Sequence, residues 1–392
     1  MIKRNFLDLL IGLTVSIIIF NFYHFTKELS LGQYSDWLIN YQGGFVRRGL
    51  IGEILFQIHS ILSIRLDLVI FITVSLLYIF FYKNFLKIIK TLDFSFLNLL
   101  IIFSPLSFVW PVMEEKASGR KDILYLFFLS LIALNLKKIN FYNQKYLIIL
   151  LSAVTIFSHT GFLFLIPSFL IIFLLCNSEK KVLIILKEIF FIILSLFIFL
   201  IILLNNTQVG PEQIKLICDS VSNFVRSDCT TIGYIATLGW SFELNLDLKK
   251  SLWMRDYYHL FFSLAFLICF LPLLIVFYFS KFSNFKKFNV LLFFCFFLMG
   301  TIPLYYVGVD YGRYLHLTYL SSIIIYAVAL QNKVIIFDLP KNNYFKKFTI
   351  KPFVLVFIIF LYGFTFTVPH CCNNNFKFNF KKLVLKINEK LN

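Results

Sequence analysis

Residues 182–204 read VLIILKEIFFIILSLFIFLIILL, an apolar run in which Lys187 and Glu188 are the only charged residues. As an α-helix rising about 1.5 Å per residue, such a run spans the roughly 30 Å hydrocarbon core of a bilayer. Inside that core the backbone amides must be satisfied within the segment itself, which favours a helix. Similar runs recur along a chain that is 59% hydrophobic and 15% charged. The sequence therefore predicts an all-α, polytopic integral membrane protein.

Short loops that carry lysine separate about eleven expected crossings. These crossings cover residues 6–25, 66–82, 94–110, 123–136, 146–158, 162–176, 182–204, 260–279, 290–307, 317–330 and 353–368. Lys3 and Arg4 precede the first run and no small-residue cleavage site follows it, which favours a retained helix over a signal peptide. After an odd number of crossings the basic tail, residues 370–392, falls outside. This placement requires a tail on the membrane surface or a count that differs by one helix.

Whether residues 146–176 form one helix or two decides on which side of the membrane every later loop lies. Residues 146–176 as a single helix would extend about 46 Å, too long for a bilayer core of roughly 30 Å. The breakers His159, Gly161 and Pro167 instead favour two short helices that form a hairpin. The hairpin also places three later lysine clusters inside: residues 180–187, 281–287 and 333–351.

Two expected segments lie outside the crossings. Residues 49–64 have apolar residues at helical spacing, which predicts an amphipathic helix along the interface. Residues 205–258 form one enlarged outer loop, in which Cys218 and Cys229 are close enough to bridge in an oxidising compartment. No linker divides the chain, so we expect one membrane domain over residues 1–392.

The arginines are distributed unevenly between the two predicted faces. Seven of the eight fall in outer loops, whereas inner loops carry lysine. Lysine and arginine can both fix the orientation of a membrane protein. Only the guanidinium of arginine offers a planar fork that binds phosphate or carboxylate in a bidentate manner. We therefore expect an anionic substrate on the outer face. The seven are Arg47, Arg48, Arg65, Arg120, Arg226, Arg255 and Arg313.

Several functional classes are disfavoured. The formal charge of +17 is scattered among loop ends, without the basic stripe that a nucleic-acid-binding domain presents. The C-x-x-C, H-E-x-x-H, P-loop and G-x-G-x-x-G motifs do not occur. We expect no metal, no nucleotide and no other cofactor.

Residues 35–49, SDWLINYQGGFVRRG, form the richest outer segment. Gly43 and Gly44 permit a tight turn or a close backbone approach, and Arg47 and Arg48 follow just before a predicted helix begins. Glycine amides and guanidinium groups at a helix N-terminus suit a diphosphate. Asp36 is a candidate general base or sugar-hydroxyl ligand. The alternative is an ordinary juxtamembrane turn whose arginines contact lipid headgroups.

Residues 111–122 place six charges between two crossings. Paired carboxylates can divide acid and base work, but neighbouring helical residues point about 100° apart, so one carboxylate at most faces a site. Glu114 is the candidate acid or base here and Arg120 a candidate substrate ligand. A solvated charged turn is the alternative.

Residues 308–316, GVDYGRYLH, carry a second set of candidates. Asp310 and Arg313 are three residues apart, so the carboxylate can orient the guanidinium toward substrate. Their neighbouring tyrosines offer platforms for a sugar or an isoprenoid. A structural ion pair at a helix end is the alternative. Arg255 adds a candidate binding residue, and His159 a candidate base that is otherwise a hydrogen-bonded structural histidine.

In its helix count, its enlarged outer loop and its outer arginines, the chain resembles bacterial O-antigen polymerases of the Wzy type. It is also similar to the broader GT-C class of lipid-dependent glycosyltransferases. The segments GGFVRRG (residues 43–49), GRKD (residues 119–122) and DYGRY (residues 310–314) are similar to those of membrane proteins from polysaccharide clusters.

The resemblance implies an enzyme that polymerises undecaprenyl-diphosphate-linked oligosaccharide repeat units at the periplasmic face of the bacterial inner membrane. Arg47, Arg48 and Arg313 would hold the diphosphate, and Asp36 or Asp310 would deprotonate the acceptor hydroxyl. Membrane lipids and a chain-length regulator protein are the expected partners. Residues 205–258 would be the periplasmic loop.

Three other classes remain open. A GT-C enzyme that adds one sugar from a polyprenyl phosphate would share this fold and differ only in product. A flippase or transporter would need charges within its helices, which are nearly free of them here. A membrane acyltransferase would need a second histidine beside His159.

Overall fold

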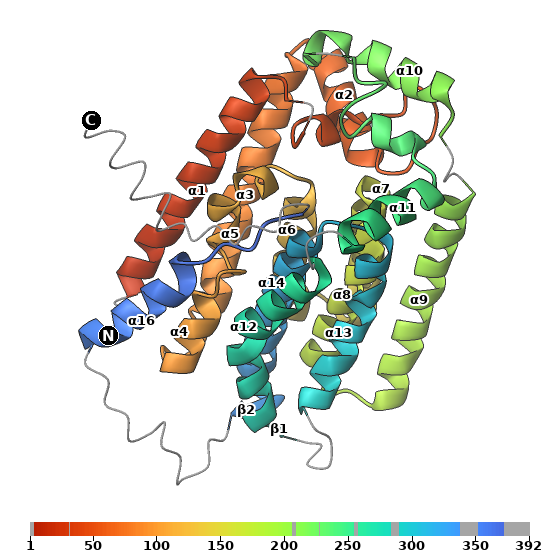
Figure 1. Cartoon of the computed structure of the whole chain (residues 1–392). Helices are drawn as coiled ribbons and strands as arrows, with labels where there is room; N and C mark the ends of the chain where they lie inside the picture. The colour runs from red at the N-terminus through yellow and green to blue at the C-terminus, as the bar shows by residue number, and fades with distance from the viewer. Residues whose placement is uncertain are drawn as a thin grey trace, which may run out of the picture. The chain divides into compact units, whose positions relative to one another are not determined.

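A computed structural model describes residues 4–30, 32–205, 209–226, 228–254, 258–283, 290–337 and 352–371. The chain is 75% helical, which confirms the prediction of an all-α protein. Among the described residues, one short antiparallel pair of strands departs from it. Helices and strands are labelled in Figure 1.

The α-helices are α1 (Arg4–Lys27), α2 (Leu50–Leu62), α3 (Leu66–Ile89), α4 (Phe96–Ile102), α5 (Trp110–Met113), α6 (Asp122–Asn135), α7 (Phe141–Ser158), α8 (Pro167–Cys176), α9 (Val182–Leu204), α10 (Pro211–Ser220), α11 (Phe242–Met254), α12 (Tyr258–Phe279), α13 (Val290–Val307), α14 (Tyr311–Gln331) and α16 (Pro352–Phe364). The 3-10 helices are η1 (Ser35–Leu38), η2 (Glu115–Ala117), η3 (Leu136–Lys138), η4 (Thr160–Leu165), η5 (Ser222–Phe224) and η6 (Ala236–Gly239). The strands are β1 (Ser280–Phe282) and β2 (Ile335–Phe337).

Within the described ranges, five helices are long and apolar enough to cross a membrane. They are Asn5–Lys27, Leu66–Ile89, Val182–Leu204, His259–Phe279 and Tyr311–Gln331. Each overlaps an expected crossing, so the chain is a multi-pass helical membrane protein. The amphipathic helix expected at residues 49–64 is α2, which begins after Gly49 and ends at Leu62.

The chain divides into two compact units, and each is described here by itself. Unit 1 comprises Met1–Thr14, Leu86–Glu115 and Leu248–Asn392. Unit 2 comprises Val15–Phe85 and Lys116–Asp247. The expectation of one membrane domain over residues 1–392 stays a prediction.

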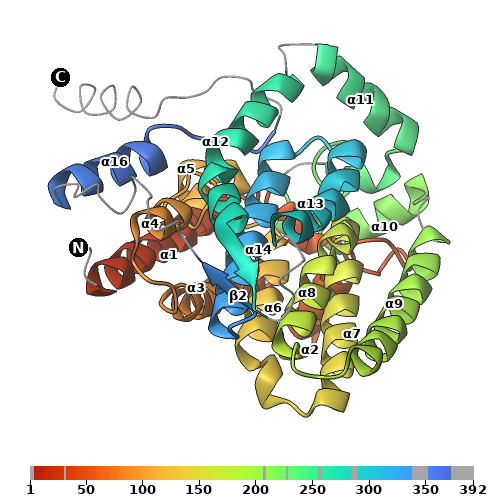
Figure 2. The same cartoon turned by 90° about the horizontal axis from the view of Figure 1, so that it is seen from below.

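In unit 2, the helical hairpin predicted at residues 146–176 is present. α7 ends at Ser158 and α8 begins at Pro167, with η4 between them. The Nδ2 of Asn177, just after α8, donates a hydrogen bond to Oε1 of Gln144 near the start of α7 (2.7 Å). The two helices therefore run antiparallel, side by side (Figure 2).

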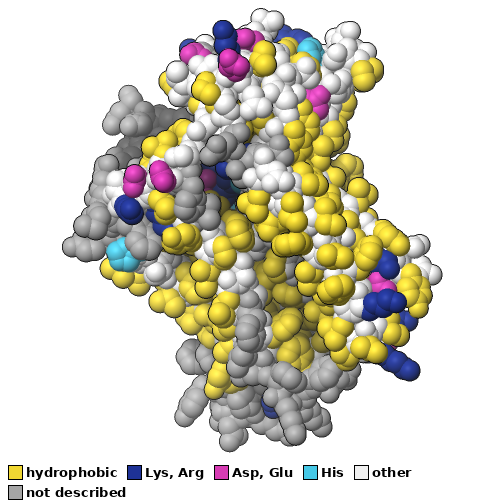
Figure 3. All heavy atoms as spheres, turned by 90° about the vertical axis from the view of Figure 1, so that its right-hand side faces the viewer, with side chains coloured by type: hydrophobic (Ala, Val, Ile, Leu, Met, Phe, Trp, Pro, Cys, Tyr) yellow, Lys and Arg dark blue, Asp and Glu magenta, His cyan; other side chains and the backbone are white. Residues whose placement is uncertain are grey.

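The helix α9 packs on α7 and presents an apolar face outward. Leu183, Phe190 and Phe197 on this helix are all more than half exposed. Figure 3, in which this side of the molecule faces the viewer, shows hydrophobic side chains spread over it. An apolar surface of this extent fits contact with lipid, because hydrocarbon does not penalise it as water does. Near one end, Lys145 pairs with the buried Glu188 at 2.7 Å.

In unit 1, α14 forms the core. Most of its residues are buried, and it packs against both α12 and α13 (Figure 2). Polar side chains fasten it to the segment around α4: Tyr319 donates to the carbonyl oxygen of Ile101 at 2.9 Å, and His316 Nδ1 lies 2.8 Å from that of Leu106. At the other end of these helices β1 pairs with β2, with Lys281 opposite Ile336.

The expectation of one continuous crossing over residues 94–110 is wrong. α4 ends at Ile102, and a turn leads from Phe103 to the short helix α5. Pro105 explains the break, since proline removes an amide donor and disfavours helical backbone before it. Ser104 accordingly bonds across the unit, its hydroxyl donating to the carbonyl oxygen of Cys269 (3.3 Å).

Candidate functional site

A buried lysine and carboxylate meet in unit 2. Asp36 in η1 is 2% exposed, and Lys121 at the start of α6 is 0% exposed. The Nζ of Lys121 lies 3.9 Å from Oδ1 of Asp36 and donates a hydrogen bond to the carbonyl oxygen of Arg48 (2.7 Å). Within the described residues, Oδ1 of Asp36 accepts no hydrogen bond. One lysine thus joins the acidic and the arginine ends of residues 35–49, which we call the arginine segment.

The electrostatics of Lys121 follow from its neighbours. Burial lowers the pKa of Lys121 to about 8, the carboxylate of Asp36 opposes this by attraction, and the charge of Arg48 lowers it further. The ammonium remains mostly protonated at neutral pH. Two cations, Lys121 and Arg48, therefore lie together here, and their charges favour an anionic ligand.

The two arginines of the segment have different surroundings. Arg47 Nη2 lies 3.3 Å from the carbonyl oxygens of both Thr237 and Leu238, to which it donates. Burial, and then the charge of Arg48, lower the pKa of Arg47 to about 10, so it stays cationic at neutral pH. Arg48 has a left-handed backbone (φ 72°), which costs energy for a side chain of this kind. Among the described residues the Nε atoms of both arginines have no hydrogen-bond partner.

Gly43 and Gly44 form a tight turn and a close backbone contact, but this contact is with another part of the chain. Gly44 has φ +98° and its amide donates to the carbonyl oxygen of Tyr41 (2.9 Å). A Cβ on Gly43 would lie 2.3 Å from the carbonyl oxygen of Gln213 in α10. The space beside Gly43 is therefore filled by the backbone of α10. Binding of a diphosphate by Gly43 and Gly44 stays a prediction.

The segment Gly119–Asp122 is fastened to the arginine segment through Gly119. The indole Nε1 of Trp37 donates to the carbonyl oxygen of Gly119 at 2.6 Å. The amide of Gly119 in turn donates to the hydroxyl of Tyr78 at 3.0 Å. These bonds place Lys121 against Asp36 and bring Arg120 into the same unit.

Arg120 is buried and lies over the ring of Tyr234, 5.3 Å from its centroid. Its Nε donates to the carbonyl oxygen of Lys116 at 3.2 Å. A guanidinium stacked on an aromatic ring is held in orientation by a cation–π interaction. The ring belongs to the loop of residues 205–258, so this loop takes part in the cluster.

The large loop is itself folded and packs on the arginine segment. The predicted disulfide between Cys218 and Cys229 is present. Ser220 Oγ accepts a hydrogen bond from Asn40 Nδ2 (3.0 Å), and the amide of Tyr234 donates to Oγ of Ser35 (3.3 Å). Ser220, inside the loop closed by the disulfide, and Tyr234, after it, thus hold the segment that carries Asp36 and the arginines.

A second group of titratable side chains lies in unit 1. The predicted pair of Asp310 and Arg313 is confirmed, with Oδ2 and Nη1 3.1 Å apart. Glu114 Oε1 lies 3.0 Å from Nδ1 of His370. The amide of Gly312, in the first turn of α14, donates to the carbonyl oxygen of His370 (3.1 Å), which brings the two pairs together.

Ligand atoms of Asp310, His370 and Cys371 lie within 4.8 Å of one another. However, Cys371 is disulfide-bonded, and its sulfur lacks the thiolate that metals bind. Two ligands are too few for a protein-built site. We assign no metal to this group.

His159 has a local structural role. It caps η4, its Nδ1 accepting a hydrogen bond from the amide of Gly161 (3.2 Å). Its ring stacks on Phe162 with centroids 4.6 Å apart, and the residue is 6% exposed. A catalytic function for His159 stays a prediction.

The candidate residues from the sequence divide between the units. Unit 2 holds Asp36, Gly43, Gly44, Arg47, Arg48, Arg120 and His159, and unit 1 holds Glu114, Asp310 and Arg313. Arg255 lies outside the described residues. Joint action of Asp36 and Arg313 on one substrate stays a prediction.

Lys121 and His370 are members of these groups that sequence reasoning did not select. The signal for Lys121 is its position between Arg120 and Asp122 in a short loop otherwise bounded by apolar runs. The sequence places His370 at the start of a basic tail, and its partner Glu114 lies 256 residues away.

The fold and the two groups define a class: a multi-pass helical membrane protein with a cationic, disulfide-supported cluster of residues outside its long apolar helices. Comparisons with protein-family models, with curated proteins and with solved structures find no match for the chain.

Proposed function

We propose that this chain is a polymerase of surface polysaccharide (O-antigen), acting on undecaprenyl-diphosphate-linked oligosaccharide repeat units. It would work at the periplasmic face of the bacterial inner membrane, with about eleven crossings. The observation that supports this function best is the group of cations Arg47, Arg48 and Lys121, in which Lys121 lies 3.9 Å from the carboxylate of Asp36. Neighbouring guanidinium and ammonium groups suit a diphosphate leaving group.

Exposure separates the roles of the three candidate carboxylates. The side chain of Asp36 is 3% exposed, whereas those of Asp310 and Glu114 are 19% and 18% exposed. A general base must reach the hydroxyl that it deprotonates. We therefore assign the acceptor-activating role to Asp310 or Glu114, and we assign to Asp36 the positioning of Lys121 and the arginine segment.

In the reaction, the acceptor hydroxyl attacks the anomeric carbon of the glycan on undecaprenyl diphosphate. The bond between that carbon and the diphosphate oxygen breaks, the carboxylate takes the hydroxyl proton, and the diphosphate leaves as an anion. Arg47 and Arg48 offset its growing charge. Within unit 1, Asp310 orients Arg313.

The proposal is tested by deleting the gene and restoring it with either the wild type or Arg48→Ala. In the deletion strain, the ladder of surface lipopolysaccharide on a gel is expected to collapse to a single-repeat band. One guanidinium–phosphate contact contributes roughly 1.5–3 kcal/mol. Arg48→Ala is therefore expected to lower the polymerisation rate by about tenfold to over a hundredfold.

Two further variants make this experiment specific. Arg48→Gly removes the guanidinium but accepts the left-handed backbone, so its loss of activity reports the side chain alone. Arg65→Ala removes an arginine whose side chain is 76% exposed and is expected to retain the ladder. A wild-type ladder from Arg48→Gly at normal membrane levels would rule out binding of the diphosphate by Arg48. Loss of the single-repeat band on deletion would indicate an earlier step, by a single-sugar transferase or a flippase.

A further inference from the structure

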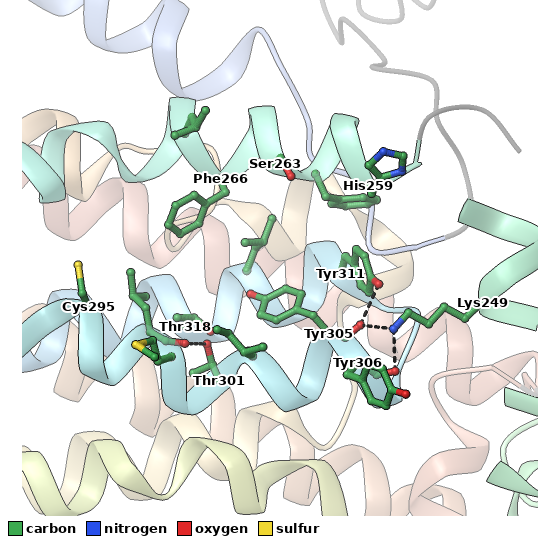
Figure 4. Close-up of a pocket in the computed structure, with 16 residues that line it drawn as sticks. Lys249, His259, Ser263, Phe266, Cys295, Thr301, Tyr305, Tyr306, Tyr311 and Thr318 are labelled. Carbon is green, nitrogen blue, oxygen red and sulfur yellow. Dashed lines mark hydrogen bonds between the residues drawn. The ribbon is translucent and has the colours of Figure 1, made fainter. Parts of the chain in front are cut away.

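A cavity of about 790 Å³ lies among α12, α13 and α14 in unit 1 (Figure 4). Its walls are mainly hydrocarbon and aromatic, including Phe262, Phe266, Leu298, Met299 and Ile302. Its volume falls within the range of roughly 300–1,000 Å³ that is usual for small-molecule sites. None of the candidate residues that the structure describes lines it.

Besides the hydroxyls of Ser263, Thr301 and Thr318, the cavity has one end that is more polar than the rest. Lys249, from α11, is 6% exposed there, and its Nζ donates to the carbonyl oxygens of Tyr305 (2.8 Å) and Tyr306 (2.7 Å). The hydroxyl of Tyr311 also donates to the carbonyl oxygen of Tyr305 (2.8 Å). Figure 4 shows Lys249 and His259 near this end and Cys295 toward the other. The polar end coincides with the ends of the helices: α13 stops at Val307 and α14 begins at Tyr311.

Several lining side chains are open to the surroundings. Leu267, Met299 and Ile302 are 54%, 59% and 57% exposed. They lie on α12 and α13, two hydrophobic helices of which α12 is long enough to cross the bilayer. In a membrane protein such exposed apolar side chains face lipid hydrocarbon. A chain from the bilayer can therefore enter between these helices without crossing polar surface.

We propose that this cavity binds an anionic phospholipid of the bilayer. Its acyl chain lies along Phe262, Phe266 and Met299, and its phosphate meets Lys249 and His259. The site matches such a molecule in polarity, with a cation and tyrosine side chains at the helix ends and hydrocarbon along the helices. Attraction of anionic headgroups to lysine at the membrane surface supplies the selectivity over neutral lipids. This inference does not rest on the proposed polymerase function.

The test uses the free thiol of Cys295, which lines the cavity and is exposed. The full-length chain is reconstituted in phosphatidylcholine vesicles with or without phosphatidylglycerol. Its modification by a maleimide is then followed by mass spectrometry of the Cys295 peptide under non-reducing conditions. Phosphatidylglycerol is expected to slow modification of Cys295 severalfold and to leave that of Cys176, which lies outside the cavity, unchanged. Equal rates at Cys295 in both vesicles would overturn the proposal.

Two matched lysine variants test whether Lys249 binds the phosphate. Lys249→Ala is expected to require about fivefold more phosphatidylglycerol for the same protection. Lys250→Ala, in which the neighbouring exposed lysine is removed, is expected to behave as the wild type. If Lys249→Ala does not fold, Ser263→Trp, which places an indole in the cavity, is expected to abolish the effect of the lipid. Stronger protection by polyprenyl phosphate than by phosphatidylglycerol would overturn the assignment of a phospholipid.

Discussion

Replacing Asp36 with asparagine is expected to lower the free energy of unfolding by about 3–5 kcal/mol, because it leaves the buried ammonium of Lys121 without its carboxylate. The amide keeps the size of the side chain, so the loss reports charge rather than packing. Unfolding in mixed detergent micelles measures it. The double variant Asp36→Asn/Lys121→Met removes both charges and is expected to recover part of the loss.

The exposed ion pair of Arg65 and Asp67 provides a matched control. The side chain of Arg65 is 76% exposed and its Nη2 lies 2.9 Å from the carboxylate. Exposed pairs contribute roughly 0–1 kcal/mol, so Arg65→Met is expected to change stability by less than about 1 kcal/mol. Equal losses of unfolding free energy for Asp36→Asn and Arg65→Met would contradict a larger contribution from the buried pair.

The free energy of unfolding is expected to depend on pH through Lys121, in a direction that its pKa fixes. The pKa of Lys121 is about 8 in the folded protein, below its ordinary value of 10.5. Between these pH values the unfolded chain binds more protons than the folded chain. Through Lys121 the protein therefore becomes more stable as pH rises from about 8 to 10.5, and less stable as pH falls through that range. Lys121→Met is expected to remove this slope. An unchanged slope in the variant would contradict the lowered pKa.

Replacing Gly52 with alanine is expected to displace α2 from the arginine segment. A Cβ at this position would lie 1.9 Å from the carbonyl oxygen of Ile39 and 2.8 Å from that of Trp37. Both are backbone atoms, which cannot turn aside as a side chain can. We expect the free energy of unfolding to fall by an amount at the upper end of the roughly 1–3 kcal/mol typical of overpacking, and we also expect loss of activity. Unfolding and the lipopolysaccharide ladder measure the two effects.

Gly12→Ala is the matched control for this substitution. Gly12 is also helical, but a Cβ there would meet nothing within 4 Å. Alanine is favoured over glycine within a helix by roughly 0.5–1 kcal/mol, so this variant is expected to be neutral or slightly stabilising. Gly52→Ala with wild-type stability and activity would contradict the close contact between α2 and η1.

Local patterns predicted much of the fold. Residues 182–204 form α9 as expected, because hydrophobicity and helical hydrogen bonding act within one segment. The hairpin was predictable from length and from the breakers near His159. The break after α4 was missed because the apolar run continues past Pro105 and hides the loss of helix. The strand pair of β1 and β2 was missed because it joins distant residues.

The site shows the same division between local and distant contacts. Asp310 and Arg313 are one helical turn apart, so the spacing alone predicted their pairing. Lys121 meets Asp36 only because Gly119 is bonded to Trp37 and Tyr78, and His370 meets Glu114 across most of the chain. Such contacts have no periodic signature in a single sequence. The disulfide of Cys218 was predictable because Cys229 is near in the chain.

The polymerase proposal is tested most directly with the purified chain in vesicles that contain undecaprenyl-diphosphate-linked repeat units labelled in the sugar. The account predicts products that lengthen by whole repeat units, each with release of undecaprenyl diphosphate, and little product from Arg48→Gly. Addition of one sugar at a time from a polyprenyl phosphate donor, or unchanged repeat units with folded wild-type protein, would contradict it.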